Sequence, residues 1–250
     1  LALEALGIRG ERVAMPVIGT CGAVLHAIKA AGGIPVLADV DHLGRLTAES
    51  VWSAAGEGPI AAAVTPGLFG LPAGGAVLEN ILGVPVIEDA AQSAFSTFNE
   101  FSHPRCVTFS FYPTKGLPAI DGGMVATNDA AIAGHIREQL DTHAVQPWES
   151  HSPRLASRLP DINACVGLAA IAEAPVRQTR LKSISQVYAR ALSGSDVSWL
   201  GAGLPRATLS RFILRFPERF ARDYFLCEAE RRGIAAGTEL VPIGIGFDRL

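Results

Sequence analysis

A lysine that follows an aromatic and hydroxyl-rich segment is the first candidate for chemistry in this sequence. The segment FSFYPTKG spans residues 109–116 and carries Lys115, one of only three lysines in a chain of 250 residues. A lysine in a partly apolar pocket can act as an amine nucleophile and form a Schiff base with a carbonyl. An ordinary solvent-exposed loop lysine is the alternative, and the spacing alone favours it.

A second candidate is the acidic pair Glu88 and Asp89 in the segment VIEDAAQ, residues 86–92. The apolar run VPVI before the pair predicts a buried strand, and open α/β sheets bind their ligands at the carboxyl ends of strands. Side chains alternate between the two faces of a strand, so only one of these acids can face such a site. An acid at this position can also serve as the N-cap of a following helix, and this purely structural role is about as well supported as a role in ligand binding.

Four residues near the ends of neighbouring expected strands supply a carboxylate, an amide, a hydroxyl and an amine. They are Asp89, Gln92, Ser110 and Lys115. Pyridoxal phosphate needs such a set, because its ring becomes an electron sink only when a carboxylate keeps the ring nitrogen protonated. The combination therefore favours a cofactor site over an isolated loop lysine.

Alternating strands and helices are expected to position these residues. From residue 12 to about residue 128, short apolar runs alternate with helical stretches, which is typical of βα units around a mainly parallel sheet. The expected strands cover residues 12–18, 34–40, 60–66, 84–90, 106–111 and 122–128. The helices between them are expected at residues 21–31, 48–55 and 75–82.

Longer helical segments follow after residue 128. Helices are expected at residues 130–141, 162–172, 176–192 and 218–232, with one strand at residues 210–217. The arginines between residues 177 and 190 are interpreted as a solvated helix face. We therefore expect a large domain over residues 1–143, followed over residues 144–250 by an interface loop, helices and the start of a smaller α+β domain.

Composition and charge exclude several classes of function. The chain is 49% hydrophobic and 18% charged, as in ordinary globular proteins, and its net charge of −3 offers no basic field for nucleic acid or anionic lipid. Its apolar runs are far shorter than the roughly 20 residues that span a bilayer. No signal peptide is visible, and the four scattered cysteines form no metal-binding pattern with histidines or acids. We expect a cytoplasmic protein with reduced thiols and no metal.

Several motifs resemble those of one protein family. The segments VIEDAAQSA, FSFYPTK, IDGGMVATND and SRLPDINACVGLAAI resemble the DegT/DnrJ/StrS family of nucleotide-sugar aminotransferases, and the similarity extends from GIPVLADVD to RRGIAAG. The resemblance implies an α/β fold of the aspartate aminotransferase type (fold type I), with a three-layer α/β/α large domain. It also implies that the natural protein extends beyond both ends of this sequence, since the family's Ser-Gly-Thr turn would precede Leu1.

The resemblance assigns a role to each of the four candidate residues. Lys115 matches the lysine that forms the Schiff base with pyridoxal phosphate and moves the proton during catalysis. Asp89 matches the acid that pairs with the ring nitrogen, Gln92 the amide beside the ring near its phenolic oxygen, and Ser110 the hydroxyl that holds the phosphate. The implied reaction is a ping-pong transamination in which an amino acid, expected to be glutamate, donates an amine to a nucleotide-linked keto sugar. The implied context is amino-sugar, polysaccharide or antibiotic biosynthesis, and the implied assembly is a homodimer.

Two alternatives to this function remain open. The first is a diverged relative that binds or senses a ligand without catalysis, because the family's stacking aromatic is absent from VIGTCGAV, residues 17–24, and Ala156 stands where the family tends to have asparagine. The second is a related keto-deoxysugar dehydratase, but those relatives carry histidine at the position of Lys115, which argues against it.

Overall fold

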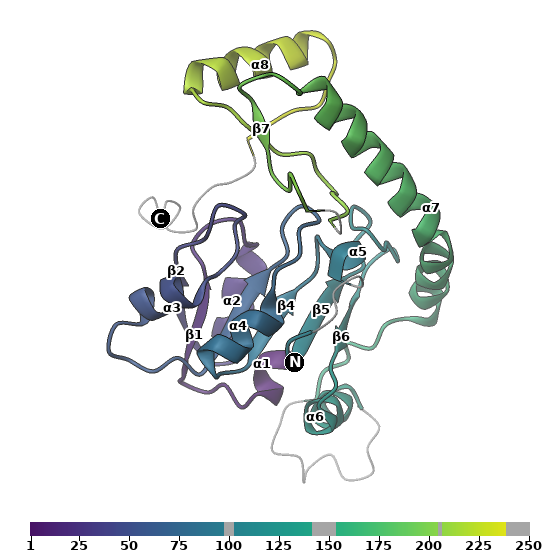
Figure 1. The fold of residues 1–250 in the computed structure, drawn as a ribbon. Helices are drawn as coiled ribbons and strands as arrows, with labels where there is room; N and C mark the ends of the chain where they lie inside the picture. The colour runs from purple at the N-terminus through teal and green to yellow at the C-terminus, as the bar shows by residue number, and fades with distance from the viewer. Residues whose placement is uncertain (98–102, 142–153, 205–206, 239–250) are drawn as a thin grey trace.

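A six-stranded sheet forms the centre of the computed structural model, which describes residues 1–97, 103–141, 154–204 and 207–238 (Figure 1). The strand order is β2-β1-β3-β4-β5-β6. The strands are β1 (Arg12–Pro16), β2 (Ile34–Ala38), β3 (Ala62–Pro66), β4 (Val86–Asp89), β5 (Cys106–Ser110) and β6 (Gly123–Ala126). The first five strands are parallel and β6 is antiparallel to β5. All six strands lie within two residues of their expected boundaries.

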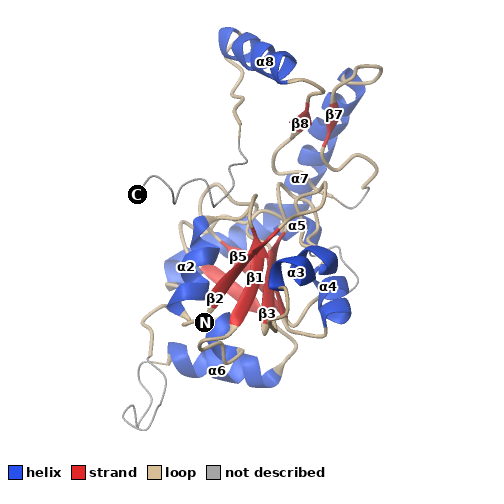
Figure 2. Cartoon of the chain, turned by 90° about the vertical axis from the view of Figure 1, so that its left-hand side faces the viewer, coloured by secondary structure: helices blue, strands red, loops and turns tan. Residues whose placement is uncertain are grey.

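Helices cover both faces of this sheet (Figure 2). One face packs against α1 (Ala2–Ala5), α2 (Gly22–Ala30) and α6 (Ala130–Leu140), and the other against α3 (Ala48–Ala55), α4 (Gly75–Leu82) and the short α5 (Ala94–Thr97). Successive residues of β1 alternate between the two layers: Val13 and Met15 pack with Ile28 of α2, whereas Ala14 packs with Val51 of α3. The expected three-layer α/β/α arrangement with a mostly parallel sheet is confirmed.

Local sequence signals explain where individual helices begin. Thr47 accepts a hydrogen bond from the Ser50 backbone N–H before α3, and the Ser50 hydroxyl accepts one from the Thr47 N–H in return. The Asp129 carboxylate accepts from the first N–H groups of α6. These caps satisfy backbone donors that a helix leaves without internal partners.

The long helix α7 (Asp161–Ala191) differs from the expected pattern. The prediction of two helices, at residues 162–172 and 176–192, was wrong, because the helix continues through Pro175. Proline removes one backbone donor and usually breaks a helix interior. Here the affected carbonyl belongs to Ile171, which is exposed, so water can replace the lost hydrogen bond.

The remaining chain forms a smaller unit beside the sheet. It contains the two-stranded antiparallel pair β7 (Ser198–Trp199) and β8 (Leu214–Arg215) and the helix α8 (Arg219–Arg231), which lie at the far end of α7 (Figure 1). The strand expected at residues 210–217 is thus only two residues long. The expected domain boundary at residue 143 lies outside the described residues. None of the described helices combines the length and the apolar character needed to traverse a bilayer.

Candidate active site

Strand register brings two of the four candidate residues to one face of the sheet. Asp89, the last residue of β4, is paired with Thr108 of the parallel strand β5. Ser110 ends β5 two residues later, so its side chain projects on the same face as that of Thr108. Asp89 and Ser110 therefore lie at the carboxyl edge of the sheet on a common face, where open α/β sheets bind ligands.

The neighbouring acid, Glu88, points to the opposite face and has a structural role. Its side chain is fully buried and accepts hydrogen bonds from the Thr97 hydroxyl at 2.9 Å and from the Gly75 backbone N–H at 3.3 Å. Burial raises the pKa of Glu88 above its ordinary value, although these two hydrogen bonds and the charge of His103 act in the opposite direction. Glu88 thus links α4 and α5 on the opposite face of the sheet. Asp89 is therefore the acid on the face of the candidate site.

Asp89 combines a local turn with an open acceptor. Its Oδ1 accepts a hydrogen bond from the Ala91 backbone N–H at 3.0 Å, which stabilises the turn after β4. Burial raises the pKa of Asp89, while the Ala91 N–H and the positive charge of Lys115 lower it. Among the described residues, none donates a hydrogen bond to Oδ2. This oxygen can therefore accept from a bound ligand.

Lys115 is held in a turn next to Asp89. Its backbone N–H donates to the Tyr112 carbonyl at 2.9 Å, and the following Gly116 lies against the ring of Phe95 in α5. The lysine is half-buried, whereas Tyr112 and Thr114 beside it are exposed. Its charge acts on the carboxylate of Asp89. The structure therefore places Lys115 at the candidate site and disfavours the interpretation of an ordinary exposed loop charge.

Gln92 and Ser110 each keep a hydrogen-bond donor available. The Gln92 Oε1 accepts from the Phe69 backbone N–H at 3.3 Å, which leaves the two N–H bonds of its Nε2 for other partners. The Ser110 Oγ accepts from the Tyr112 N–H at 3.4 Å and retains its own proton to donate. Both residues can therefore donate to an anionic ligand.

Sequence analysis missed the contacts that hold Gln92. They come from Phe69, in the loop between β3 and α4, and from Ser210, whose hydroxyl donates to the Gln92 carbonyl at 3.3 Å. In the sequence, the two glycines around Phe69, Gly67 and Gly70, are the local sign that this loop packs closely against other segments. A Cβ at either glycine would approach a neighbouring atom to 2.0 Å, Ser93 Oγ in the first case and the Thr208 carbonyl in the second.

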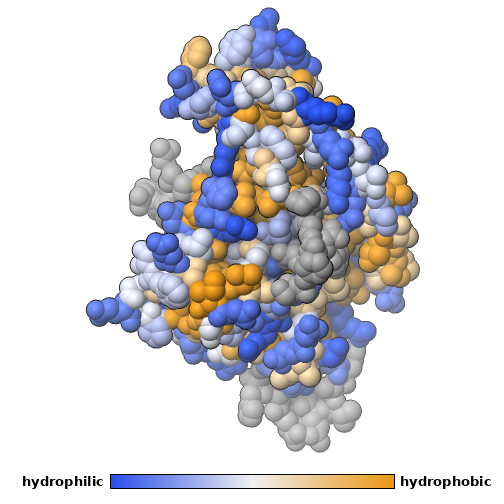
Figure 3. Space-filling view, viewed as in Figure 1, coloured by the Kyte–Doolittle hydropathy of each residue, from blue (hydrophilic) through white to orange (hydrophobic). Residues whose placement is uncertain are grey.

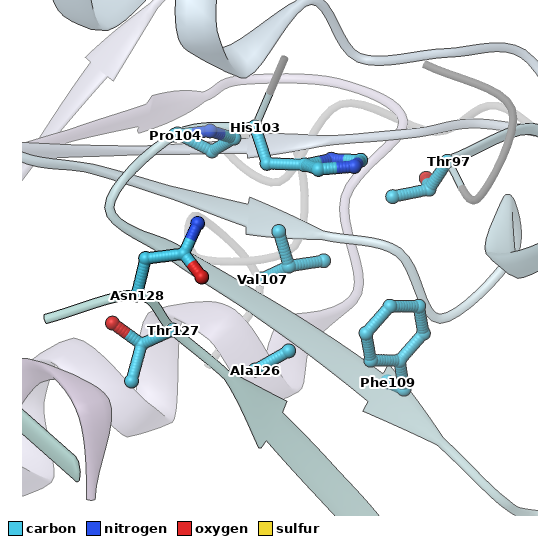
Figure 4. A pocket seen from close by; sticks show the side chains of 8 residues that line it. All are labelled: Thr97, His103, Pro104, Val107, Phe109, Ala126, Thr127 and Asn128. Atoms are coloured by element: carbon cyan, nitrogen blue, oxygen red, sulfur yellow. The ribbon is translucent and has the colours of Figure 1, made fainter. Parts of the chain in front are cut away.

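A small pocket elsewhere does not belong to this site. Its volume is about 120 Å³, and it is lined by Thr97, His103, Pro104, Val107, Phe109, Ala126, Thr127 and Asn128 (Figure 4). Val107 and Phe109 of β5 point to the face opposite that of Thr108 and Ser110. The pocket is therefore on the other side of the sheet from Asp89.

The chemistry of the donor set fits pyridoxal phosphate. A partly buried carboxylate with an open oxygen suits a protonated ring nitrogen, and a half-buried amine close to it suits a ligand aldehyde. The amide of Gln92 and the hydroxyl of Ser110 supply donors for anionic oxygens. Within residues 1–97, 103–141, 154–204 and 207–238, no group of histidines, cysteines and acids is arranged to hold a metal ion.

Comparison with known proteins identifies relatives across nearly the whole chain. The sequence model of the DegT/DnrJ/EryC1/StrS aminotransferase family matches residues 1–241. Among solved structures, DesV of S. venezuelae in complex with a ketimine intermediate matches 94% of this chain with 26% identity and a TM-score of 0.80. The aminotransferase TlmJ from Streptoalloteichus hindustanus matches 97% of it with 25% identity and a TM-score of 0.79. DesI, solved in the presence of its TDP-sugar product, matches 93% with 25% identity and a TM-score of 0.77.

The chain is shorter than these structural relatives. It covers 65% of the DesV chain, 69% of the TlmJ chain and 62% of the DesI chain. The residues matched by the family model, 1–241, include the sheet, the four candidate residues and α7, so the similarity to the family extends over the candidate site itself.

Proposed function

Because this chain belongs to the DegT/DnrJ/EryC1/StrS aminotransferase family, we propose that its protein is a pyridoxal-phosphate-dependent aminotransferase. The observation that carries the proposal is the position of Lys115 beside Asp89, at the carboxyl edge of the parallel sheet. The substrate we propose is a keto sugar carried on a nucleotide, with an amino acid, expected to be glutamate, as the amine donor.

Each side chain of the site has a task in this proposal. When bound, pyridoxal phosphate supplies an aldehyde and a protonated ring that withdraws electrons from the reacting carbon. Asp89 holds the proton on the ring nitrogen, and Gln92 and Ser110 donate hydrogen bonds to the phenolic and phosphate oxygens. The amine of Lys115 would hold the cofactor at its aldehyde carbon, and as a free base it would take up and return the proton at the reacting carbon.

Support for the sugar substrate comes from the relatives and not from the site alone. DesI is similar to this chain at 25% identity and was solved with its TDP-sugar product. This similarity favours a nucleotide-linked sugar over a free amino acid or keto acid as the amine acceptor. The choice of sugar, nucleotide and carbon position depends on loops that differ among such enzymes.

An exposed apolar surface supports a homodimer. In the N-terminal half of α7, Ile162, Leu168 and Ile171 are 69%, 67% and 53% exposed, and Figure 3 shows apolar side chains along this part of the helix at the right-hand edge of the molecule. No residue of α7 is buried within the described chain. Exposed apolar side chains mark interaction surfaces, and a second subunit would cover Leu168 and Ile171, which lie three residues apart on one side of the helix. We propose the cytoplasm as the location of the enzyme.

Trapping the cofactor on the protein tests this function. The protein is mixed with pyridoxal phosphate, reduced with borohydride and digested, and the labelled peptide is located by mass spectrometry. A label on Lys115 that persists in Lys29→Ala and is lost in Lys115→Ala supports the proposal, because Lys29 is an exposed lysine of α2. A protein that takes up no label would instead favour the non-catalytic binding relative.

A further inference from the structure

Three segments that are distant in sequence meet at Gln92 in a closed ring of hydrogen bonds. The Phe69 backbone N–H donates to Gln92 Oε1 at 3.3 Å, and the Ser210 backbone N–H donates to the Phe69 carbonyl at 2.9 Å. The Ser210 hydroxyl completes the ring by donating to the Gln92 backbone carbonyl at 3.3 Å. Phe69 belongs to the loop between β3 and α4, and Ser210 to the smaller C-terminal unit.

This ring determines which end of the Gln92 amide faces outward. A backbone N–H can only donate, so the atom that faces Phe69 must be the amide oxygen. The amide nitrogen, with two protons to donate, is then the end left for a ligand. Gln92 is therefore presented as a hydrogen-bond donor, which is the polarity that an anionic oxygen requires.

The loop that carries Phe69 is held in an unusual conformation from two sides. Phe69 has a φ of +54°, which non-glycine residues rarely adopt, and Gly70 has a φ of +91°. The Ser96 hydroxyl of α5 donates to the Gly70 carbonyl and accepts from the Thr208 backbone N–H. Such a conformation persists only where its surroundings impose it, and here residues 207–210 provide much of that support.

Apolar packing reinforces the same junction. Leu68, Phe69 and Leu71 of the loop form one buried cluster with Leu200 and Leu209 of the C-terminal unit. The C-terminal unit is therefore docked directly on the loop that orients Gln92.

We propose that Ser210 is a positioning residue for the cofactor site. Its backbone N–H holds the Phe69 carbonyl and its hydroxyl ties the Gln92 main chain to this loop, so the Phe69 N–H stays against the Gln92 Oε1 and the amide nitrogen stays turned toward the ligand. This inference rests on the proposed function, since it requires pyridoxal phosphate as the ligand. A donor held near the phenolic oxygen stabilises the ionised form of that oxygen, so a loosened Gln92 raises the pH at which the bound cofactor titrates.

The test follows the absorbance of the Lys115-bound cofactor as a function of pH in the natural protein. Ser210→Ala removes the hydroxyl and keeps the backbone N–H. Because Ser210 is exposed, folding should be preserved, and circular dichroism checks this. We expect the titration midpoint to rise by about 0.5 pH unit, because the hydrogen bond from Gln92 is weakened and not lost. Ser210→Thr, which retains a hydroxyl, should restore the original midpoint.

Two control experiments distinguish a positioning role of Ser210 from a general destabilisation of the C-terminal unit. Ser195→Ala removes an exposed hydroxyl that bonds only within its own turn, donating to the Leu192 carbonyl and accepting from the Val197 N–H, and it should leave the midpoint unchanged. In a Gln92→Ala background, Ser210→Ala should add no further shift, because the two act through one amide. An unchanged midpoint in Ser210→Ala, or an equal shift in the Gln92→Ala background, overturns the inference. Failure of the proposed function gives a different result, which is wild-type protein without any Lys115-bound cofactor.

Discussion

Glu88 and Asp89 are adjacent in β4 and serve opposite faces of the sheet. Glu88 is fully buried between α4 and α5 and accepts two hydrogen bonds, whereas Asp89 lies at the carboxyl edge within the field of Lys115. One strand thus supplies both a structural acid and a site acid, and the two can be separated by substitution.

Asp89→Asn should separate the charge of Asp89 from its role in the turn. Asparagine can still accept the Ala91 N–H through its side-chain oxygen, so the fold and some cofactor binding should be retained. The loss of the negative charge beside the ring nitrogen should reduce turnover by about 10²–10³-fold, as for other lost electrostatic contacts. Steady-state kinetics measures this effect, with Asp196→Asn, an exposed acid far along the chain, as the matched control. Turnover equal to wild type would remove Asp89 from the ring-nitrogen role.

Glu88→Gln should change how stability depends on pH. The pKa of Glu88 in the folded state is raised above its ordinary value of 4.5, so the ionised carboxylate disfavours folding. The neutral carboxyl group contributes its full stability below the unfolded-state pKa. This contribution is lost as the pH rises through the folded-state pKa. Glutamine stays neutral. The difference in unfolding free energy should therefore shift in favour of the variant as the pH rises above 4.5, by about 1.4 kcal/mol for each pH unit until the folded-state pKa is passed.

Urea denaturation at several pH values measures this difference. Glu57→Gln serves as the control, since Glu57 is exposed. A difference between wild type and Glu88→Gln that stays constant over this range would contradict the raised pKa of Glu88.

The strands could be predicted, and the four candidate residues could be proposed, because their signals are local. Apolar runs such as residues 84–87 are typical of strands that are buried on both faces, and Asp89, Gln92, Ser110 and Lys115 belong to two short motifs. The family resemblance already selected Asp89 over Glu88, but the register of β4 against β5, which only the folded sheet defines, gives the physical reason for that choice.

Other features depend on contacts that no local pattern contains. The continuity of α7 through Pro175 contradicts the usual effect of proline and follows from the exposure of the helix. The contact between Ser210 and Gln92 joins residues 118 positions apart. Chain topology alone brings such residues together, so this contact could not be predicted from the sequence.

Lys115→Ala should abolish turnover while the fold is retained. The Lys115 side chain is half-buried, and the hydrogen bond described for its turn is made by the Lys115 backbone N–H. Removing the side chain therefore breaks no described hydrogen bond of the fold. In the proposed function this amine binds the cofactor and moves the proton, so its loss should lower turnover by at least about 10²-fold. The assay is amine transfer to a nucleotide-linked keto sugar, with the thermal midpoint as the measure of folding. Retention of more than a tenth of the wild-type turnover would show that another amine performs the reaction.

Gly70→Ala tests the junction between the large domain and the C-terminal unit. Gly70 has a φ of +91°, and a Cβ there would lie 2.0 Å from the Thr208 carbonyl oxygen. Both the strained backbone and the steric overlap destabilise the variant, and we expect a loss of about 2–4 kcal/mol in unfolding free energy. The matched control is Gly134→Ala, at an exposed position in α6 where a Cβ meets nothing within 4 Å. That control should gain about 0.5–1 kcal/mol, because alanine is the better helix former. Chemical denaturation of both variants gives the comparison, and a Gly70→Ala protein as stable as wild type would show that residues 207–210 do not pack on this loop in solution.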